Sequence, residues 1–199
     1  ASFYSNKIAW YENDGSESFT EHVITTSAGY ATSVYAVDVD ADGDIDVLSA
    51  SSNDDKIAWY ENDGSQSFTE HAISTSADGA SCVYTADVDG DGDMDVLSAS
   101  SSDDKIAWYE NDGSESFTEH VISTSADDAR SVYAADVDAD GDLDVLSASF
   151  YDNKIAWYES QGPAAPTGFT LFPQETHIIL TWSPVSDDDF QYYILERST

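Results

Sequence analysis

Short apolar runs alternate with polar, turn-forming segments along most of the chain. Four runs recur in a fixed order, and in one copy they are SCVYTADV at 81–88, DVLSAS at 95–100, KIAWYEN at 105–111 and SFTEHVIS at 116–123. Asp, Gly, Ser and Asn fill the segments between them, as is typical of turns. No segment sustains the apolar period of about 3.6 residues that an amphipathic helix needs. The pattern therefore predicts an all-β chain of short strands.

The third run is apolar on both of its faces. Ile106 and Trp108 lie on one side of the expected strand, and Ala107 and Tyr109 lie on the other. A strand that is covered on both sides suits a stack of sheets better than a one-sided sandwich. We therefore expect each set of four strands to pack between neighbouring sheets.

The four runs repeat at a constant interval. The phrase KIAWYE begins every 49 residues, at Lys7, Lys56, Lys105 and Lys154. Four strands in a period of about 40–50 residues are typical of a propeller blade. The sequence thus predicts four-stranded antiparallel β-propeller blades in an incomplete ring, within residues 1–161. The expected parts are a half blade at 1–25 and blades at about 31–74, 80–123 and 129–161.

The repeat stops near Gln161, and the composition changes at Gly162. All four prolines follow, together with the apolar phrases HIILTW and QYYIL. Residues 162–199 resemble the start of a fibronectin type III domain, which implies a truncated β-sandwich. An irregular cap over the last blade is the alternative. Because the first and last blades are unfinished, we expect either a fragment or a chain that neighbouring chains complete.

The repeated phrases also carry a family resemblance. DVDADGDIDVLSAS, DVDGDGDMDVLSAS and DVDADGDLDVLSAS, with KIAWYENDGSESFTEHVI and its copies, resemble the FG-GAP/VCBS repeats. That family builds the calcium-bearing propellers of integrin α-chains and of many large bacterial surface proteins. The resemblance covers about 80% of the chain. It implies a calcium-stabilised propeller module in a secreted or surface-anchored protein.

Three acidic loops are the candidate metal sites. Each has Asp at positions 1, 3, 5, 7 and 9 and Gly at position 6, and the Asp residues are Asp38, Asp40, Asp42, Asp44, Asp46, Asp87, Asp89, Asp91, Asp93, Asp95, Asp136, Asp138, Asp140, Asp142 and Asp144. Calcium takes about six to eight oxygen ligands, which carboxylates on alternate residues of a tight loop can supply. We expect side-chain ligands from positions 1, 3, 5 and 9, and the resemblance implies the main-chain carbonyl at position 7. The prediction is about three Ca²⁺ ions, and solvated acidic turns are the alternative.

The charge excludes several classes of partner. The chain has 40 acidic residues against 6 Lys and Arg, a formal net charge of -34. Clustered basic residues that hold nucleic acid or an anionic membrane surface are missing, and no apolar run approaches the roughly 18 residues of a membrane span. A single cysteine, Cys82, excludes an internal disulfide. Loops of this kind fill at millimolar calcium, so we expect an extracellular location.

No catalytic constellation stands out in the sequence. His22, His71 and His120 recur one repeat apart, so they fall on different blades and cannot easily share a substrate. The repeated carboxylates are assigned to calcium. We therefore expect a chain that is not an enzyme, in which the repeated tryptophans pack between blades. A sugar-stacking role for those tryptophans is the alternative.

Sequence differences between the repeats concentrate at one end of the expected blades. The loops after the second strand and between blades vary, whereas the acidic loops and the ENDGS turns at the other end barely differ. We expect any partner to bind the variable face, and the candidates are Tyr30, Asn53, Arg130, Phe150 and Tyr151. The alternative is that these loops vary because nothing touches them.

The most specific functional hypothesis is a module for adhesion, or for binding a protein or a glycan. A structural component that self-assembles through its incomplete blades is a second hypothesis. An accessory region of a secreted polysaccharide-degrading enzyme is a third. Fold by itself does not separate the three.

Overall fold

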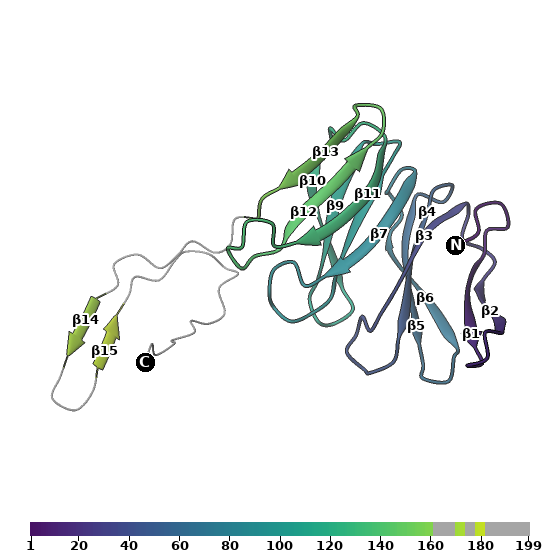
Figure 1. Ribbon diagram of the computed structural model, residues 1–199, viewed down its shortest axis with the longest axis horizontal. Helices are drawn as coiled ribbons and strands as arrows, with labels where there is room; N and C mark the ends of the chain where they lie inside the picture. The colour runs from purple at the N-terminus through teal and green to yellow at the C-terminus, as the bar shows by residue number, and fades with distance from the viewer. Residues whose placement is uncertain (161–169, 174–177, 182–199) are drawn as a thin grey trace. The chain divides into compact units, whose positions relative to one another are not determined.

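The structure is a computed structural model that describes residues 1–160, 170–173 and 178–181. The chain divides into two compact units, Ala1–Ser160 and Gln161–Thr199. Every regular element of the described residues is a β-strand, which confirms the all-β prediction (Figure 1). Within those residues, no helix is long and apolar enough to cross a membrane.

The first unit contains four antiparallel sheets. A hairpin of β1 (Ile8–Asn13) and β2 (Phe19–Thr25) comes first. The next sheet consists of β3 (Ala31–Val37), β4 (Asp46–Ser51), β5 (Lys56–Asn62) and β6 (Phe68–Ser74). The third consists of β7 (Ala80–Ala86), β8 (Asp95–Ser100), β9 (Lys105–Asn111) and β10 (Phe117–Ser123). The last consists of β11 (Ala129–Ala135), β12 (Asp144–Ser149) and β13 (Lys154–Tyr158).

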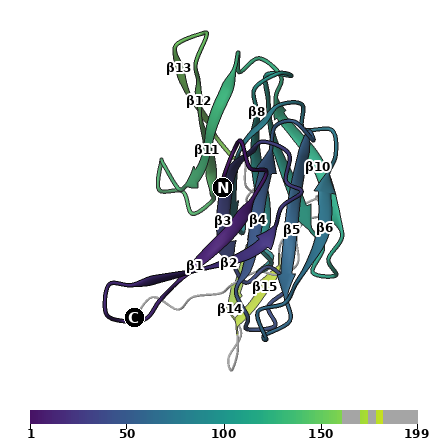
Figure 2. The same cartoon turned by 90° about the vertical axis from the view of Figure 1, so that its right-hand side faces the viewer.

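Each strand in these sheets pairs with its neighbour along the chain. Figure 2 shows β3, β4, β5 and β6 side by side in that order. This up-and-down arrangement is that of a propeller blade. The predicted fold class, incomplete propeller blades, is therefore confirmed, and we call the sheets blades below.

The second unit has one described hairpin, β14 (Thr170–Pro173) paired with β15 (Ile178–Thr181). The rest of the predicted fibronectin type III-like segment at 162–199 lies outside the described residues.

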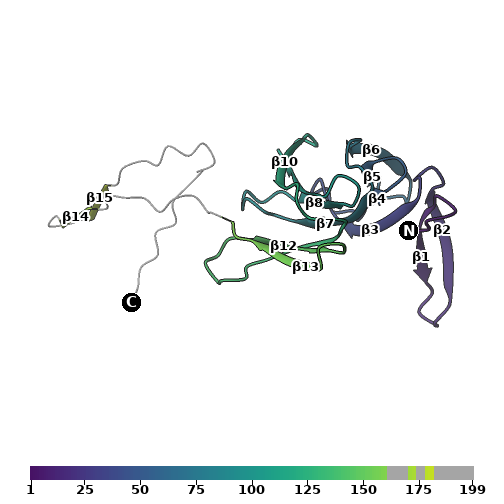
Figure 3. The ribbon, with the colours of Figure 1, turned by 90° about the horizontal axis from the view of Figure 1, so that it is seen from above.

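The apolar core of the first unit lies between successive blades. Trp59 of β5 and Val83 of β7 belong to one buried cluster, and Ile106 of β9 and Val132 of β11 belong to the next. Figure 3 shows the blades standing next to one another when seen from above. A strand such as β5 is buried on both faces because a neighbouring blade covers each of them, as the KIAWY pattern predicts.

The first strands of successive blades are joined directly. The hydroxyl of Thr32 on β3 donates a hydrogen bond to the carbonyl of Ala80 on β7, at 2.8 Å. The hydroxyl of Ser81 on β7 donates in the same way to Ala129 on β11, at 2.6 Å. These bonds hold one end of each blade against the next, so the loops that connect the strands are placed at fixed intervals.

Candidate metal centre

The three acidic loops join the first and second strands of the three blades that begin at β3, β7 and β11. Each loop turns sharply at its sixth position, where Gly43, Gly92 and Gly141 have φ angles of 97°, 104° and 103°. Residues with a side chain rarely adopt such angles, so only glycine makes this turn without strain. The chain direction then reverses within the loop and the carboxylates of the flanking residues come together.

Hydrogen bonds within each loop fix the carboxylates. In the first loop, Oδ2 of Asp38 accepts the N–H of Gly43 at 3.0 Å, and Oδ1 of Asp40 accepts the N–H of Asp42 at 3.1 Å. Oδ1 of Asp42 accepts the N–H of Asp44 at 2.8 Å. The second and third loops repeat these bonds. Asp42 thus uses one oxygen to shape the loop and keeps the other available.

Three groups of predicted ligands come close together. In each, one carboxylate oxygen per residue lies within 4.8 Å of the others, and the groups are Asp38, Asp40 and Asp42; Asp87, Asp89 and Asp95; and Asp136, Asp138 and Asp144. Every donor is a carboxylate oxygen, which is the chemistry that a hard divalent cation prefers.

The ninth position has a second role that sequence reasoning missed. The carboxylate of Asp46 is buried and accepts two main-chain N–H groups, from Val39 at 3.1 Å and from Asn62 at 2.7 Å. Asp95 and Asp144 make the equivalent bonds in their blades. The residue therefore ties the acidic loop to the end of the third strand. A carboxylate oxygen has two lone pairs, so this role leaves capacity for a metal.

The seventh position faces away from the carboxylate groups. A side chain at Gly64 would clash with Oδ2 of Asp44, and one at Gly113 would clash with Oδ2 of Asp93. The Asp side chain therefore covers the turn after the third strand, and glycine leaves room for it there. The Asp at position 7 can therefore offer a metal only its main-chain carbonyl. That part of the ligand set stays a prediction.

Buried oxygens without partners show that the carboxylates fit a cation. Within the described residues, Oδ1 of Asp38 and Oδ1 of Asp87 are buried and accept no hydrogen bond. A buried charge without a partner is costly, and a bound cation would remove that cost. Desolvation also raises the pKa of Asp40, Asp89 and Asp138, which occupy the third position. Burial raises the pKa of Asp95 to about 6.

Neighbouring loops are close enough to influence one another. A small recess opens between the first and second loops, and its wall includes Asp40, Asp93 and Glu115. The side-chain amide of Asn111 reaches across it and donates to the carbonyl of Val39 at 3.4 Å. A cation in one loop would therefore lower the electrostatic cost of the carboxylates in the next.

At the other end of the blades, the structure brings Tyr30 and Asn53 together. The N–H of Asn53 donates to the carbonyl of Gly29 at 3.1 Å, which ties the loop after β4 to the segment that precedes β3. Phe3 stacks on Tyr30, with ring centroids 4.5 Å apart, and Tyr4 next to it is exposed. Sequence reasoning missed Phe3, although ASFYSN at the start repeats ASFYDN at 148–153.

The remaining candidates for the partner face also lie together. Arg130 pairs with Asp128 at 2.7 Å, and the carbonyl of Asp128 accepts the N–H of Phe150 at 3.0 Å. Phe150 and Tyr151 are exposed and their rings make an edge contact. The two groups of candidates belong to the first and last of the three blades that begin at β3, β7 and β11.

The recurring histidines lie within single blades. His71 stacks on Trp59, with ring centroids 4.7 Å apart, and its Nε2 lies 2.8 Å from a carboxylate oxygen of Glu61. His22 and His120 make equivalent contacts. These contacts join the third and fourth strands of each blade, so the histidines contribute to packing within the blade.

The acidic loops and the strands around them also match a known protein family. A family model described as "FG-GAP-like repeat" matches residues 1–49, 38–98 and 87–147. The chain belongs to the FG-GAP-like repeat family. The predicted family is thus confirmed, and the resemblance of 162–199 to fibronectin type III stays a prediction.

Similar solved structures include a lectin from Agrocybe aegerita, which is described as specifically recognising non-reducing terminal N-acetylglucosamine. That structure is 17% identical to this FG-GAP-like chain, with a TM-score of 0.47. The match covers 70% of this chain and 40% of the lectin chain, so this chain spans less than half of that protein. Comparison with curated proteins gave no match.

Proposed function

We propose that this FG-GAP-like chain is a calcium-stabilised, non-catalytic binding module of a secreted or cell-surface protein. The observation that carries the proposal is the set of three carboxylate groups, two of which contain a buried oxygen without a hydrogen-bond partner. Calcium in these loops fixes the entry into the second strand of each blade and stabilises the folded state by mass action. Extracellular calcium is concentrated enough to fill sites of this class.

The binding surface in this proposal is the variable face opposite the acidic loops. Exposed aromatic rings and an arginine gather there, and such side chains are enriched at the centres of binding interfaces. Phe3, Tyr30, Phe150 and Tyr151 supply the rings, and Arg130 supplies the cation. The partner is a protein or a glycan, and adhesion is the role that such a face serves.

Calorimetric titration with calcium tests the proposal most directly. We expect about three bound ions per chain, because there are three equivalent loops. The double substitution Asp87→Asn and Asp89→Asn should remove one of them. Asp78→Asn is the matched control, since Asp78 is exposed and lies between blades at the other end of the molecule. Calcium should also raise the melting temperature markedly over that in EDTA, and an identical melt in both would refute the proposal.

The binding part is tested separately on a glycan array and on a panel of extracellular matrix proteins. Tyr30→Ala and Tyr151→Ala should weaken any binding that is found, while the calcium-dependent melt stays as in the wild type. Loss of binding after the loop substitutions alone would place the partner on the calcium face instead.

A further inference from the structure

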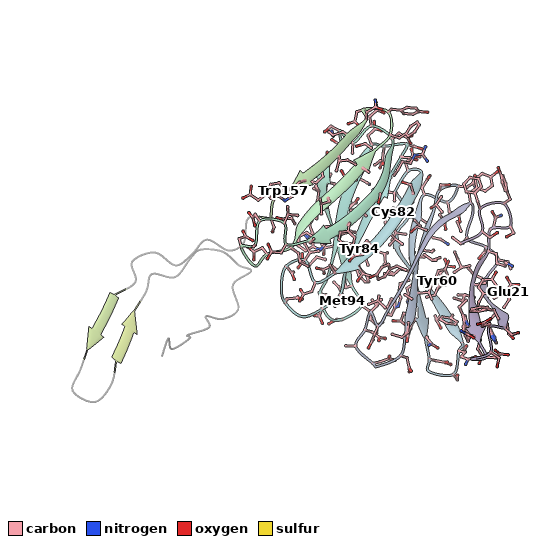
Figure 4. The ribbon with its side chains drawn as sticks, in the orientation of Figure 1. Glu21, Tyr60, Cys82, Tyr84, Met94 and Trp157 are labelled. Atoms are coloured by element: carbon pink, nitrogen blue, oxygen red, sulfur yellow. The ribbon has the colours of Figure 1, made fainter. Side chains whose placement is uncertain are left out.

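The last blade presents an open apolar face among the described residues. Ile155 on β13 is 76% exposed, whereas Ile106, at the same place on β9, is 0% exposed. Trp157, on the same face of β13, is 47% exposed. Figure 4 shows Trp157 at the opposite end of the row of blades from Glu21. No described residue covers this face.

The blade that begins at β3 presents the opposite face. Val34 on β3 is 40% exposed, whereas Val83 and Val132, at the same place on β7 and β11, are each 3% exposed. Val83 is buried in a cluster with Leu48 and Ala50 of the preceding blade. Val34 lacks such a cover from the described residues.

These two faces are the halves of one interface. Within the chain, the leucine and alanine of one second strand cover the valine of the next first strand, as Leu97 and Ala99 cover Val132. Leu146 and Ala148 on β12 hold the same places and are only partly buried. The face around Leu146 and Ala148 therefore has the shape and chemistry to cover Val34 of another copy.

A second copy can dock in this way only if one strand gives up its place. The strand β1 precedes β3 and is packed on the blade of β3 through Ile8, which is buried against Ala31 and Tyr60. Suppose that the β3–β6 blade of a second copy packs on β11 and β12 of the first. The β1 strand of the second copy would then occupy the place of β13 in the first. The two strands share the sequence KIAWY, so either fits the register of β12.

We propose that two copies of the chain join by strand exchange, in which the β1–β2 hairpin of one copy replaces β13 of the other and pairs with β12. The present pairs of Ala148 with Ile155 and of Ser147 with Ala156 become pairs with Ile8 and Ala9 of the second copy. The new sheet has four strands, because β2 comes with β1.

The energetics favour the exchange. The hydrogen bonds lost between β13 and β12 are replaced by equivalent bonds between β1 and β12, because β1 and β13 share the sequence. Ile155 is 76% exposed and Trp157 is 47% exposed before the exchange, so less burial is lost than a covered third strand such as β9 would lose. Burial is gained at Val34 and at Leu146, and apolar burial is the main driving force of association. The contact joins different faces of the two copies, so it builds rings or filaments.

Charge sets the conditions for this association. Each copy carries a formal net charge of -34, so copies repel one another in dilute buffer. Calcium and salt reduce that repulsion. Association should therefore strengthen with both.

Light scattering on the 199-residue chain across a concentration series in millimolar calcium tests the exchange. We expect a mass of two or more times 21.6 kDa. Val34→Asp should return the mass to that of a single chain, because it places a charge in the new interface. Val121→Asp is the matched control and should leave the mass unchanged, since Val121 is 54% exposed and lies on β10, outside the interface. A single-chain mass at every concentration would overturn the proposal, as would an unchanged mass for Val34→Asp.

A disulfide trap tests the strand register. One chain carries Ala9→Cys, the other carries Ser147→Cys, and both carry Cys82→Ser. Opposed residues of antiparallel strands have Cα atoms about 4.5–5.5 Å apart, within reach of a disulfide. Mixing the two should give a cross-linked heterodimer. Ser98→Cys is the matched control, because Ser98 holds the same place on β8 but pairs with β9, which is not exchanged. No cross-link with Ser147→Cys, or an equal one with Ser98→Cys, would contradict the exchange.

Discussion

The blade of β7–β10 and the blade of β11–β13 carry nearly the same sequence but differ in burial. Ile106 and Leu97 are fully buried in the first, whereas Ile155 is exposed and Leu146 is half-buried in the second. The difference follows from neighbours, because the first blade has one on each side and the second has a described neighbour on one side only. The repeat therefore encodes an interface between blades, and a blade on its own does not bury its apolar residues.

The same contrast extends to the acidic loops. Burial raises the pKa of Asp95 in the central blade to about 6, although two main-chain N–H groups bond its carboxylate. In the last blade, the N–H of Ser160 holds the pKa of the equivalent Asp144 below its usual value. The two equivalent carboxylates are both buried, but their pKa values shift in opposite directions. We expect the central loop to gain more from a bound cation than the last one.

The largest expected effect comes from truncating the same isoleucine in the two blades. Ile106→Ala leaves a cavity in a packed cluster and should cost about 2–5 kcal/mol of unfolding free energy. Ile155→Ala removes an exposed side chain and should stay within about 0.5 kcal/mol of the wild type. Urea unfolding in calcium, followed by tryptophan fluorescence, measures both. Equal losses for the two variants would show that the face of β13 is covered in solution.

A smaller effect is expected at the joint between first strands. Ser81→Ala removes the hydroxyl that donates to Ala129 of the next blade and to Ala99 of its own blade, and should cost about 1 kcal/mol. Arg130 holds the same place in the last blade, where its guanidinium pairs with Asp128 instead. Arg130→Lys keeps a cation beside Asp128, whose side chain is only 5% exposed, and should cost about 0–1 kcal/mol because the side chain at position 130 is mostly exposed. Unfolding in urea compares the two, and a smaller loss for Ser81→Ala would contradict the role of the hydroxyl.

Much of the fold could be predicted from the sequence because the same order of apolar runs and turn segments occurs in every repeat. Strands fall on the recurring apolar runs, and the burial of both faces of KIAWY follows from its lack of alternation. The exposure of Ile155 could not be predicted in this way, because KIAWY reads the same in every copy. Burial there depends on which blade lies next, and no local pattern records that.

The sequence predicted that carboxylates of each acidic loop come together, and the structure groups three of the five in each loop, but the sequence did not predict their separate roles. The spacing of Asp38, Asp40 and Asp42 indicates a shared centre, and the structure brings these carboxylates together. The bonds of Asp46 to Val39 and Asn62 depend on how the third strand ends beside the loop. That is a tertiary relation between segments, so the pattern of alternating Asp does not contain it.

The lysines show the same limit. A lysine begins each third-strand phrase KIAWY, and an Asp or Asn precedes it in every copy, so the sequence alone indicates no partner on another strand. The structure pairs Lys7 and Lys56 with Glu21 and Glu70, which lie on the adjacent fourth strand. Lys105 pairs with both Asp103 and Glu119. Lys154 pairs with Asp152, at 2.9 Å, in the last blade, where β13 has no fourth strand among the described residues.

The smallest expected effect concerns the tyrosines that line the first strands. The ring of Tyr84 lies between those of Tyr35 and Tyr133, with centroids 5.1 and 4.6 Å away. Burial and the hydroxyl of Tyr133 raise the pKa of Tyr84 to about 12. The unfolded chain therefore releases this proton first, at its ordinary pKa of about 10, and stability falls as the pH rises from 10 toward 12.

Tyr84→Phe removes this proton, so the variant should lose less stability than the wild type over the same alkaline range. Urea unfolding at several pH values measures the slope, and absorbance at 295 nm follows tyrosine ionisation directly. An unchanged slope in the variant would mean that Tyr84 ionises as readily in the folded chain as in the unfolded one. In that case the central position of β7, between two other first strands, would give its tyrosine no protection from solvent, and the contrast between central and terminal blades would be confined to the faces that carry Ile106 and Ile155.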